Sequence, residues 1–355
     1  MKKFFTVVLC LMTLLGAASC GQSSVQESSI AQSTSTNNTQ QTGSASAPEI
    51  NIVLSDINNE DSSLGQASSM FAQLVNERSN GRIHVETYFN GQLGDESENV
   101  ENLVSGVVGI TRVSVANLPT RGIDVPEYEL FGLPYLIRNE AHASNFFASE
   151  DAQKLAARVS EVTNGEIVSL DAYIVASPRH FFAKTPVASM SDMSGMKVRS
   201  ETSEVKTAII EAFGMSPTPL ALNDMYSALQ TGMIVGGEHN LANIKSYAFY
   251  EQCPYVLLTG HNYNVNVYLI SGTVWSALSP EDQELIQSAM KEACDWCTEY
   301  SMEEDSALRA ELEAEGVTFT EPEDLDVWQE AAQPLYDKYA ADYEDFVQTV
   351  LSYDQ

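Results

Sequence analysis

Hydrophobic and polar positions follow a regular order along the first half of the chain. Residues 49–57 and 82–89 alternate as strands do, whereas apolar residues recur at helical spacing over residues 62–81. Residues 95–107 continue as a helix and residues 109–115 as a third strand. This β-α-β-α-β order predicts a largely parallel sheet covered by helices.

A second series of strands and helices follows, and the acidic C-terminal part has a mostly helical pattern. We expect strands near residues 167–175, 196–200, 215–220, 233–237 and 263–271, and helices over 202–213 and 223–232. About 300 residues are more than one hydrophobic core usually serves, so two domains are expected. A cleft between two α/β units is where ligands usually bind.

The first twenty residues have the pattern of an export signal. Lys2 and Lys3 precede an apolar run from Phe4 to Leu15, and small residues lead to Cys20. The stretch "LLGAASC" resembles a bacterial lipoprotein signal, in which Cys20 becomes the lipidated first residue. A plain secretory signal cut near Ala18 is the alternative.

Residues 21–47 form a polar segment with Val25 and Ile30 as its large apolar residues. Such a segment cannot bury enough surface to fold, so we expect a flexible tether. The folded body then begins near Pro48. No later stretch approaches the length of a transmembrane helix.

The net charge narrows the choice of partners. The formal charge is −31, and it becomes −33 when Lys2 and Lys3 are removed. This charge argues against nucleic acid or anionic lipid as a partner. An acidic ligand would have to be held by local positive charge.

Three cysteines lie beyond the signal, at positions 253, 294 and 297. The stretch "CDWC" has the spacing of a redox or metal motif, but it lies inside a helical run without a second Cys or His pair. Helix-facing thiols, or one disulfide among the three, are better explanations. No nucleotide, zinc or nucleophile motif occurs in a suitable setting, so we expect neither cofactor nor metal.

Five motifs occur along the chain in an order that is typical of one protein family. They are "SNGRIHVETYFNGQLGDE" (79–96), "FGLPYLIRNEAHA" (131–143), "DMSGMKVRS" (192–200), "GMSPTPLALNDMYSALQTG" (214–232) and "FYEQCPYVLLTGH" (249–261). Together they resemble the solute-binding proteins of tripartite ATP-independent periplasmic (TRAP) transporters, the C4-dicarboxylate-binding-like family.

The resemblance implies an α/β, two-domain, periplasmic-binding-protein-like fold with a central cleft and a long domain-crossing helix. One domain is expected to comprise residues 48–176 and about 265–304. The other is expected to comprise residues 177–264 and about 305–355.

The same resemblance implies an extracytoplasmic protein, lipid-anchored or periplasmic, that captures a small organic acid. It would deliver this acid to the small and large membrane subunits of a TRAP permease. C4-dicarboxylates, sugar acids, keto acids and aromatic acids all stay open. The alternatives are a binding protein for a sensor system and a secreted enzyme or thiol oxidoreductase built on "CDWC".

The resemblance also implies ligand-binding residues. Arg199 falls on the family arginine that forms a two-pronged salt bridge to the ligand carboxylate, for which a planar guanidinium is well suited. Arg179 falls on a second family arginine, with Ser177 where the family usually has glycine. Further pocket positions fall on Ser63, Ser114, Thr202 and Leu222.

The stretch "VGGEHN" departs from the family pattern. Val235, Gly237 and His239 replace the usual Asp, Gln and Asn. The glycines are expected to let a loop approach the ligand, with His239 facing it. A protonated His239 would bind the carboxylate more tightly at low pH, and a neutral imidazole that hydrogen-bonds a ligand hydroxyl is the alternative.

Arg112 lies two residues before Ser114 and therefore on the same face of a predicted strand. If Ser114 lines the cleft, Arg112 is placed to hold a second anionic or hydroxyl-rich end of the ligand. The alternative is a charge that pairs with one of the protein's own carboxylates.

Overall fold

The structure is a computed structural model that describes residues 49–354. The predicted export signal, the lipidation of Cys20 and the tether over residues 21–47 lie outside the described residues. Within residues 49–354, no helix is long and apolar enough to cross a membrane.

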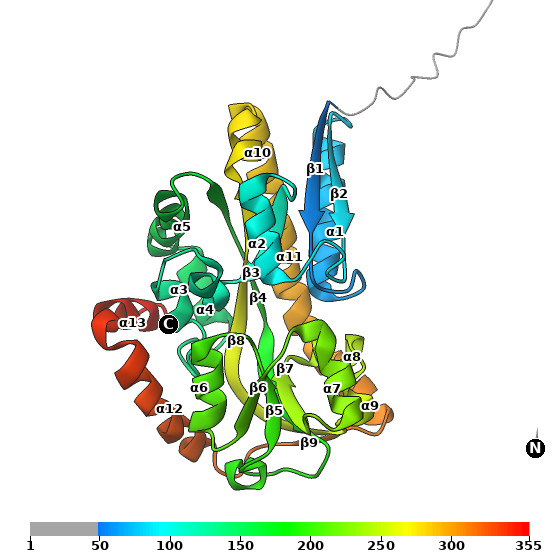
Figure 1. Ribbon diagram of the computed structural model, residues 1–355, viewed down its shortest axis with the longest axis vertical. Coiled ribbons are helices and arrows are strands. Elements are labelled where there is room, and N and C mark those ends of the chain that lie inside the picture. Colours follow the sequence, from blue (N-terminus) through cyan, green and yellow to red (C-terminus); the bar gives the residue numbers. More distant parts are fainter. Residues whose placement is uncertain (1–48, 355) are drawn as a thin grey trace, which may run out of the picture. The chain divides into compact units, whose positions relative to one another are not determined.

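One mixed sheet organises the described chain, as Figure 1 shows. The strand order is β2-β1-β3-β8-β4-β7-β5-β6, and β9 pairs with β8. The strands are β1 (Ile50–Ser55), β2 (Ile83–Tyr88), β3 (Ile110–Ser114), β4 (Ile167–Ala183), β5 (Lys197–Ser200), β6 (Ser216–Pro219), β7 (Gly236–His239), β8 (Tyr255–Ser271) and β9 (Thr318–Thr320). The predicted α/β class is confirmed.

The predicted parallel pairing is right for the outer strands and wrong for the centre. β1 pairs in parallel with β2 and β3, as β5 does with β6 and β7. β4 and β8 run antiparallel to each other. β4 is also antiparallel to β7, and β8 is antiparallel to β3. Each has 17 residues and extends well beyond its predicted range. Their register shifts at three places, one beside Pro178, and such bulges interrupt the alternation from which strands are predicted.

The helices cover the sheet and include one that is much longer than the others. They are α1 (Ser63–Arg78), α2 (Glu96–Ser105), α3 (Glu127–Leu130), α4 (Glu140–Phe147), α5 (Glu150–Val162), α6 (Glu204–Ala212), α7 (Met225–Thr231), α8 (Leu241–Ser246), α9 (Phe249–Gln252), α10 (Gly272–Ala277), α11 (Pro280–Ala314), α12 (Leu325–Tyr339) and α13 (Glu344–Leu351).

Local capping fixes where α1 and α2 begin. The Ser62 hydroxyl accepts a hydrogen bond from the Gly65 N–H at 3.1 Å and so caps α1. Asp95 and Glu98 form a reciprocal capping box at the start of α2. These helix starts lie beside the carboxyl ends of β1 and β2, where a ligand site is expected.

Helix α11 connects two hydrophobic clusters. Ile286, Met290 and Cys294 pack with α1 and with strands β1, β2 and β3. Leu308 and Leu312 pack with α7, α8 and α9. A long helix of 35 residues is therefore present, and Figure 1 shows it running from the region of α10 toward α8 and α9. That it crosses between two domains stays a prediction.

The predicted domain boundaries all fall inside continuous elements. Those after residues 176, 264 and 304 lie within β4, β8 and α11. Val175 and Val265 are partners in the sheet, so β4 and β8 lie side by side where the first two of these boundaries fall. The division into two domains stays a prediction, in which these three elements would be the connections.

Candidate functional site

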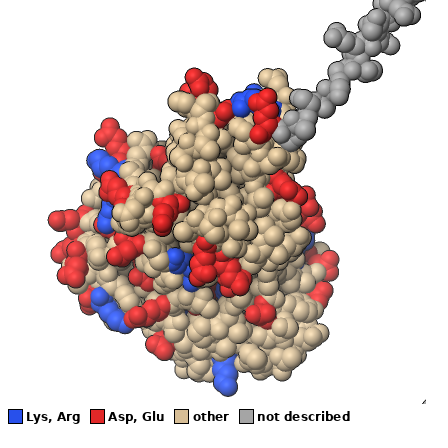
Figure 2. Space-filling view, turned by 45° about the horizontal axis from the view of Figure 1, so that its top comes forward, with Lys and Arg blue, Asp and Glu red and all other residues tan. Residues whose placement is uncertain are grey.

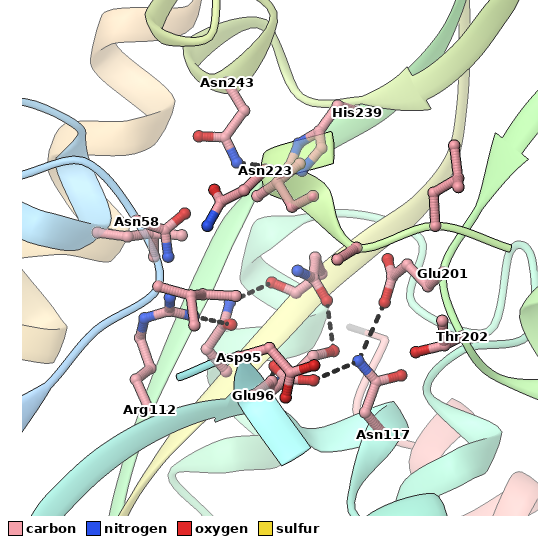
Figure 3. A pocket seen from close by; sticks show the side chains of 18 of the residues that line it. Asn58, Asp95, Glu96, Arg112, Asn117, Glu201, Thr202, Asn223, His239 and Asn243 are labelled. Atoms are coloured by element: carbon pink, nitrogen blue, oxygen red, sulfur yellow. Dashed lines mark hydrogen bonds between the residues drawn. The ribbon is translucent and has the colours of Figure 1, made fainter. Parts of the chain in front are cut away.

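A polar pocket is lined by residues from elements near both edges of the sheet. Asn58 follows β1 and Glu96 is the first residue of α2, whereas Glu201 and Thr202 follow β5 and His239 ends β7 (Figure 3). The pocket has a volume of about 750 Å³, including the part that opens to solvent.

The surroundings of the pocket are acidic. Figure 2 shows Asp and Glu spread over the visible face, with Lys and Arg sparse. A ligand anion therefore has to be held by positive charge inside the pocket, where four arginines line the wall: Arg112, Arg121, Arg179 and Arg199.

Arg199, in β5, is the pocket arginine without a carboxylate partner. The residue is only 5% exposed, and its Nε donates to the Leu220 carbonyl oxygen at 3.0 Å. Within residues 49–354, no carboxylate oxygen lies within 4.0 Å of its guanidinium, and neither Nη atom has a hydrogen-bond partner. Burial lowers the pKa of Arg199, and Glu201 and Glu238 counteract this only in part. The guanidinium therefore has free donors in the paired geometry that a carboxylate needs.

Arg179, in β4, is held by two carboxylates. Its Nη2 donates to Glu238 Oε1 at 2.6 Å and to the Glu238 carbonyl oxygen at 3.1 Å, and its Nε also bonds Glu238. Glu201 Oε1 lies 3.1 Å from the same Nη2. Burial lowers the pKa of Arg179, but the two carboxylates outweigh burial and raise it above its ordinary value. Arg179 therefore joins β4 to β7 and to the end of β5.

Arg112, in β3, is also neutralised by the protein. Its Nη2 and Nε donate to the two Asp56 oxygens at 2.7 and 3.3 Å, and its Nη1 donates to Asn266 Oδ1 at 2.5 Å. The Ser68 hydroxyl donates to Asp56 as well, at 2.8 Å. The alternative of a charge paired within the protein is therefore the one that the geometry favours.

His239, at the end of β7, is buried and neutral. The Asn240 N–H donates to its Nδ1 at 3.0 Å, and its Nε2 lies 3.1 Å from the Asn243 side-chain amide. Burial lowers the pKa of His239 to about 3, and the Arg179 and Arg199 guanidiniums act in the same direction. The geometry therefore favours the neutral imidazole over the protonated one.

The two glycines before His239 serve packing, and the loop expected there is a strand. A Cβ at Gly236 would lie 2.4 Å from the Phe182 carbonyl oxygen, and one at Gly237 would lie 2.1 Å from Met225 Cε. Neither glycine lines the pocket. The expectation that they admit the ligand was wrong, because the close approach is between β7, β4 and α7.

Comparison with known proteins gives this pocket its context. Residues 54–342 match DctP, bacterial extracellular solute-binding protein, family 7. The chain belongs to this family. The family is one of solute-binding proteins, which disfavours the alternative of a secreted enzyme.

Individual relatives cover most of this family 7 protein. The sialic acid-binding periplasmic protein SiaP of Vibrio cholerae is 29% identical over 273 residues, which are 77% of this chain and 83% of SiaP. The C4-dicarboxylate-binding periplasmic protein DctP of Rhodobacter capsulatus is 27% identical over 299 residues, which are 83% and 88% of the two chains. A crystal structure of a TRAP periplasmic solute binding protein from Pseudomonas putida F1 with bound D-glucuronate is similar with a TM-score of 0.80 at 26% identity, covering 85% and 96% of the two chains.

Most of the residues expected at the site of this solute-binding protein lie together. Seven of the eight line the pocket: Arg112, Ser114, Arg179, Arg199, Thr202, Leu222 and His239. Ser63 does not, because it opens α1 where that helix packs against α11, and its carbonyl oxygen accepts from Cys297 Sγ at 3.3 Å. Its neighbour Leu64 lines the pocket instead.

Sequence reasoning missed most of the polar lining. Asn117 donates to Glu96 Oε2 at 2.8 Å and to Glu201 Oε2 at 3.1 Å, as Figure 3 shows. Glu201 follows Arg199 by two positions, so the same-face argument used for Arg112 could have found it. Scattered asparagines carry no such signal.

The cysteines give no support to thiol chemistry. Cys253, Cys294 and Cys297 are free and buried. Burial raises the pKa of Cys297 to about 12 and raises that of Cys294 as well, which disfavours the reactive thiolate. Among residues 49–354, no group of three or more His, Cys, Asp or Glu side chains could hold a metal ion.

Proposed function

We propose that this solute-binding protein captures a small sugar acid, whose carboxylate pairs with Arg199. The observation that carries the proposal is the state of Arg199, which is buried against the pocket without any carboxylate partner among the described residues. A ligand carboxylate would supply both the missing charge and two acceptors.

The rest of the lining supports a ligand that is rich in hydroxyl groups. Amide and hydroxyl side chains predominate among the uncharged polar residues: Asn58, Asn117, Asn223, Asn243, Asn264, Asn266, Ser114 and Thr202. Such groups both donate to and accept from sugar hydroxyls. Relatives named for sialic acid and found with D-glucuronate agree with this class of ligand.

The proposed function includes delivery to the small and large membrane subunits of a TRAP permease. The support is membership of family 7 and the similarity to a TRAP periplasmic solute binding protein. Several charges of the pocket wall are already paired within the protein, which leaves Arg199 as the positive charge for the ligand.

We also propose that a lipid on Cys20 holds the protein at the outer face of the membrane. The support is the "LLGAASC" stretch and the polar segment that follows it. Replacing Cys20 with Ala should release the protein from the membrane fraction and leave the affinity of the folded body unchanged. A Cys20→Ala protein that stays membrane-bound after a carbonate wash would contradict the anchor.

Mass spectrometry and thermal shift together test the proposed ligand class. Ligand released from the purified, denatured protein should have the mass of a sugar acid. D-glucuronate, D-galacturonate and sialic acid should include compounds that raise the melting temperature, whereas D-glucose, which lacks the carboxylate, should not. Stabilisation by D-glucose equal to that by the acids would reject the role of the carboxylate.

A further inference from the structure

Glu201 is a buried carboxylate in a pocket that has to attract an anion. It follows β5 directly, two positions after Arg199, and both side chains line the pocket. The residue is 7% exposed. Burial would raise the pKa of Glu201, but Arg179, Lys206 and Arg199 lower it to about 2, so the group is ionised at neutral pH.

The protein uses only part of the hydrogen-bonding capacity of Glu201. Its Oε1 lies 3.1 Å from Arg179 Nη2, and its Oε2 accepts from Asn117 Nδ2 at 3.1 Å. An ionised carboxylate has about four lone-pair sites, so capacity remains for a donor from the pocket. Arg179 also has Glu238 as a partner, so Glu201 is not needed to neutralise it.

The two arginines on the pocket wall formed by β3 and the segment after it have carboxylate partners within the protein. Asp56 neutralises Arg112 at 2.7 Å, and Glu96 lies 3.5 Å from Arg121. Among the described residues, a ligand whose carboxylate binds Arg199 would therefore find no second pocket guanidinium that lacks a carboxylate partner. A second ligand carboxylate would meet Glu96 and Glu201 instead.

We infer that Glu201 is a specificity-determining residue, which accepts a hydrogen bond from a ligand hydroxyl and repels a second ligand carboxylate. The inference rests on the proposed function, because it assumes that Arg199 binds the first carboxylate. It restricts the ligand to polyhydroxylated monocarboxylates, such as uronic acids, and excludes the dicarboxylates of the same carbon skeleton.

A matched pair of ligands tests this role. D-glucuronate and D-glucarate have the same six carbons, but D-glucarate carries a second carboxylate in place of the aldehyde carbon and cannot close the pyranose ring of D-glucuronate. The effect of charge is therefore taken from the change in the ratio of their dissociation constants when Glu201 is replaced. At pH 7.5 the carboxyl groups of both are ionised. Calorimetry on the parent should give a dissociation constant for D-glucarate roughly 100-fold weaker than that for D-glucuronate, because like charges brought together across an interface are strongly unfavourable.

Two variants distinguish the effect of the Glu201 charge in the pocket from the effect of the protein's net charge. Glu201→Gln keeps the shape and removes the charge, and it should bring the two dissociation constants to within roughly tenfold of each other. Glu204→Gln removes the same charge from a side chain that is 75% exposed and pairs with Lys338 outside the pocket. It should keep the ratio of the parent.

The outcomes distinguish the two proposals. A parent that binds neither acid and is stabilised by none of D-glucuronate, D-galacturonate and sialic acid would reject the proposed function for sugar acids and the role of Glu201 with it. A parent that binds D-glucarate as tightly as D-glucuronate would reject the role of Glu201 alone, whether or not Glu201→Gln folds. An unchanged ratio in a folded Glu201→Gln protein would do the same.

Discussion

The two sides of the pocket treat positive charge differently. On the side formed by β1, β3 and α2, Arg112 pairs with Asp56 and Arg121 lies near Glu96. On the side formed by β4, β5 and β7, Arg179 is paired with Glu238 and Glu201, but Arg199 has no carboxylate partner among the described residues. The number of arginines in a pocket is therefore a poor guide to the number of anion sites.

The comparison also separates two roles that look alike in the sequence. A paired, buried arginine holds elements together, and removing it leaves an uncompensated carboxylate. An unpaired, buried arginine is itself unfavourable until a ligand supplies the missing charge. Folding stability should therefore depend on Arg112, and ligand affinity on Arg199.

The largest expected effect is on the paired side. Arg112→Met leaves Asp56 buried without its cation, so the free energy of unfolding should fall by about 3–5 kcal/mol. Denaturant unfolding measures this loss. The double variant with Asp56→Asn should recover most of it, because neither charge then remains. A single variant as stable as the parent would mean that the pair contributes nothing.

A smaller loss is expected on the unpaired side when the charge is kept. Arg199→Lys retains a cation but loses the planar fork, so binding of D-glucuronate should weaken by about 1.5–3 kcal/mol, the value of a charged hydrogen bond. Arg78→Lys, at the exposed end of α1, is the matched control and should bind like the parent. Equal affinities for Arg199→Lys and the parent would show that no two-pronged contact exists.

The buried histidine predicts how stability depends on pH. Unfolded His239 takes up a proton below about pH 6.5, whereas the folded residue does so only near its pKa of about 3, so stability is lost as the pH falls between these values. From pH 7.5 to 5 the parent should lose about 2 kcal/mol more than His239→Asn.

Other groups titrate in the same range but are common to both proteins. His180, whose pKa burial lowers to about 3, adds a loss of the same sign. Burial raises the pKa of Asp171 and Asp305 to about 6, which acts in the opposite direction. The difference between His239→Asn and the parent isolates His239, and parallel pH profiles of stability would contradict its neutral, buried state.

The smallest expected effect is on the pH dependence of binding. A neutral His239 takes up no proton with the ligand, so the dissociation constant should change with pH in the same way for the parent and for His239→Asn. Calorimetry from pH 5.5 to 8.0 checks this. Tighter binding at low pH in the parent alone would restore the protonated role.

Local patterns were enough to predict the elements near the site. The helical spacing predicted a buried face with Leu64, Ala67, Phe71, Leu74 and Val75, and all of these are buried in α1 except Leu74, which is half-buried. The motif around Arg199 correctly located an arginine in the pocket. The lengths of β4 and β8 escaped prediction because their bulges break the alternation of side chains.

Charge pairing could not be predicted, because it depends on residues far apart in the chain. Asp56 and Arg112 are 56 positions apart, and Arg179 and Glu238 are 59 apart. Nothing in the residues around Arg112 shows that a carboxylate at the end of β1 will reach it. The difference between the two pocket sides therefore appears only in the folded chain.

Arg199 is best tested by changing the charge of the ligand and of the protein together. D-glucuronamide has the shape of D-glucuronate without its negative charge. Calorimetry of both compounds with the parent and with Arg199→Ala gives the coupling energy between the two charges. The coupling should be at least about 2 kcal/mol, with the parent preferring the acid and the variant discriminating little. Equal losses of affinity for the acid and the amide would show that Arg199 supports the pocket without binding the carboxylate.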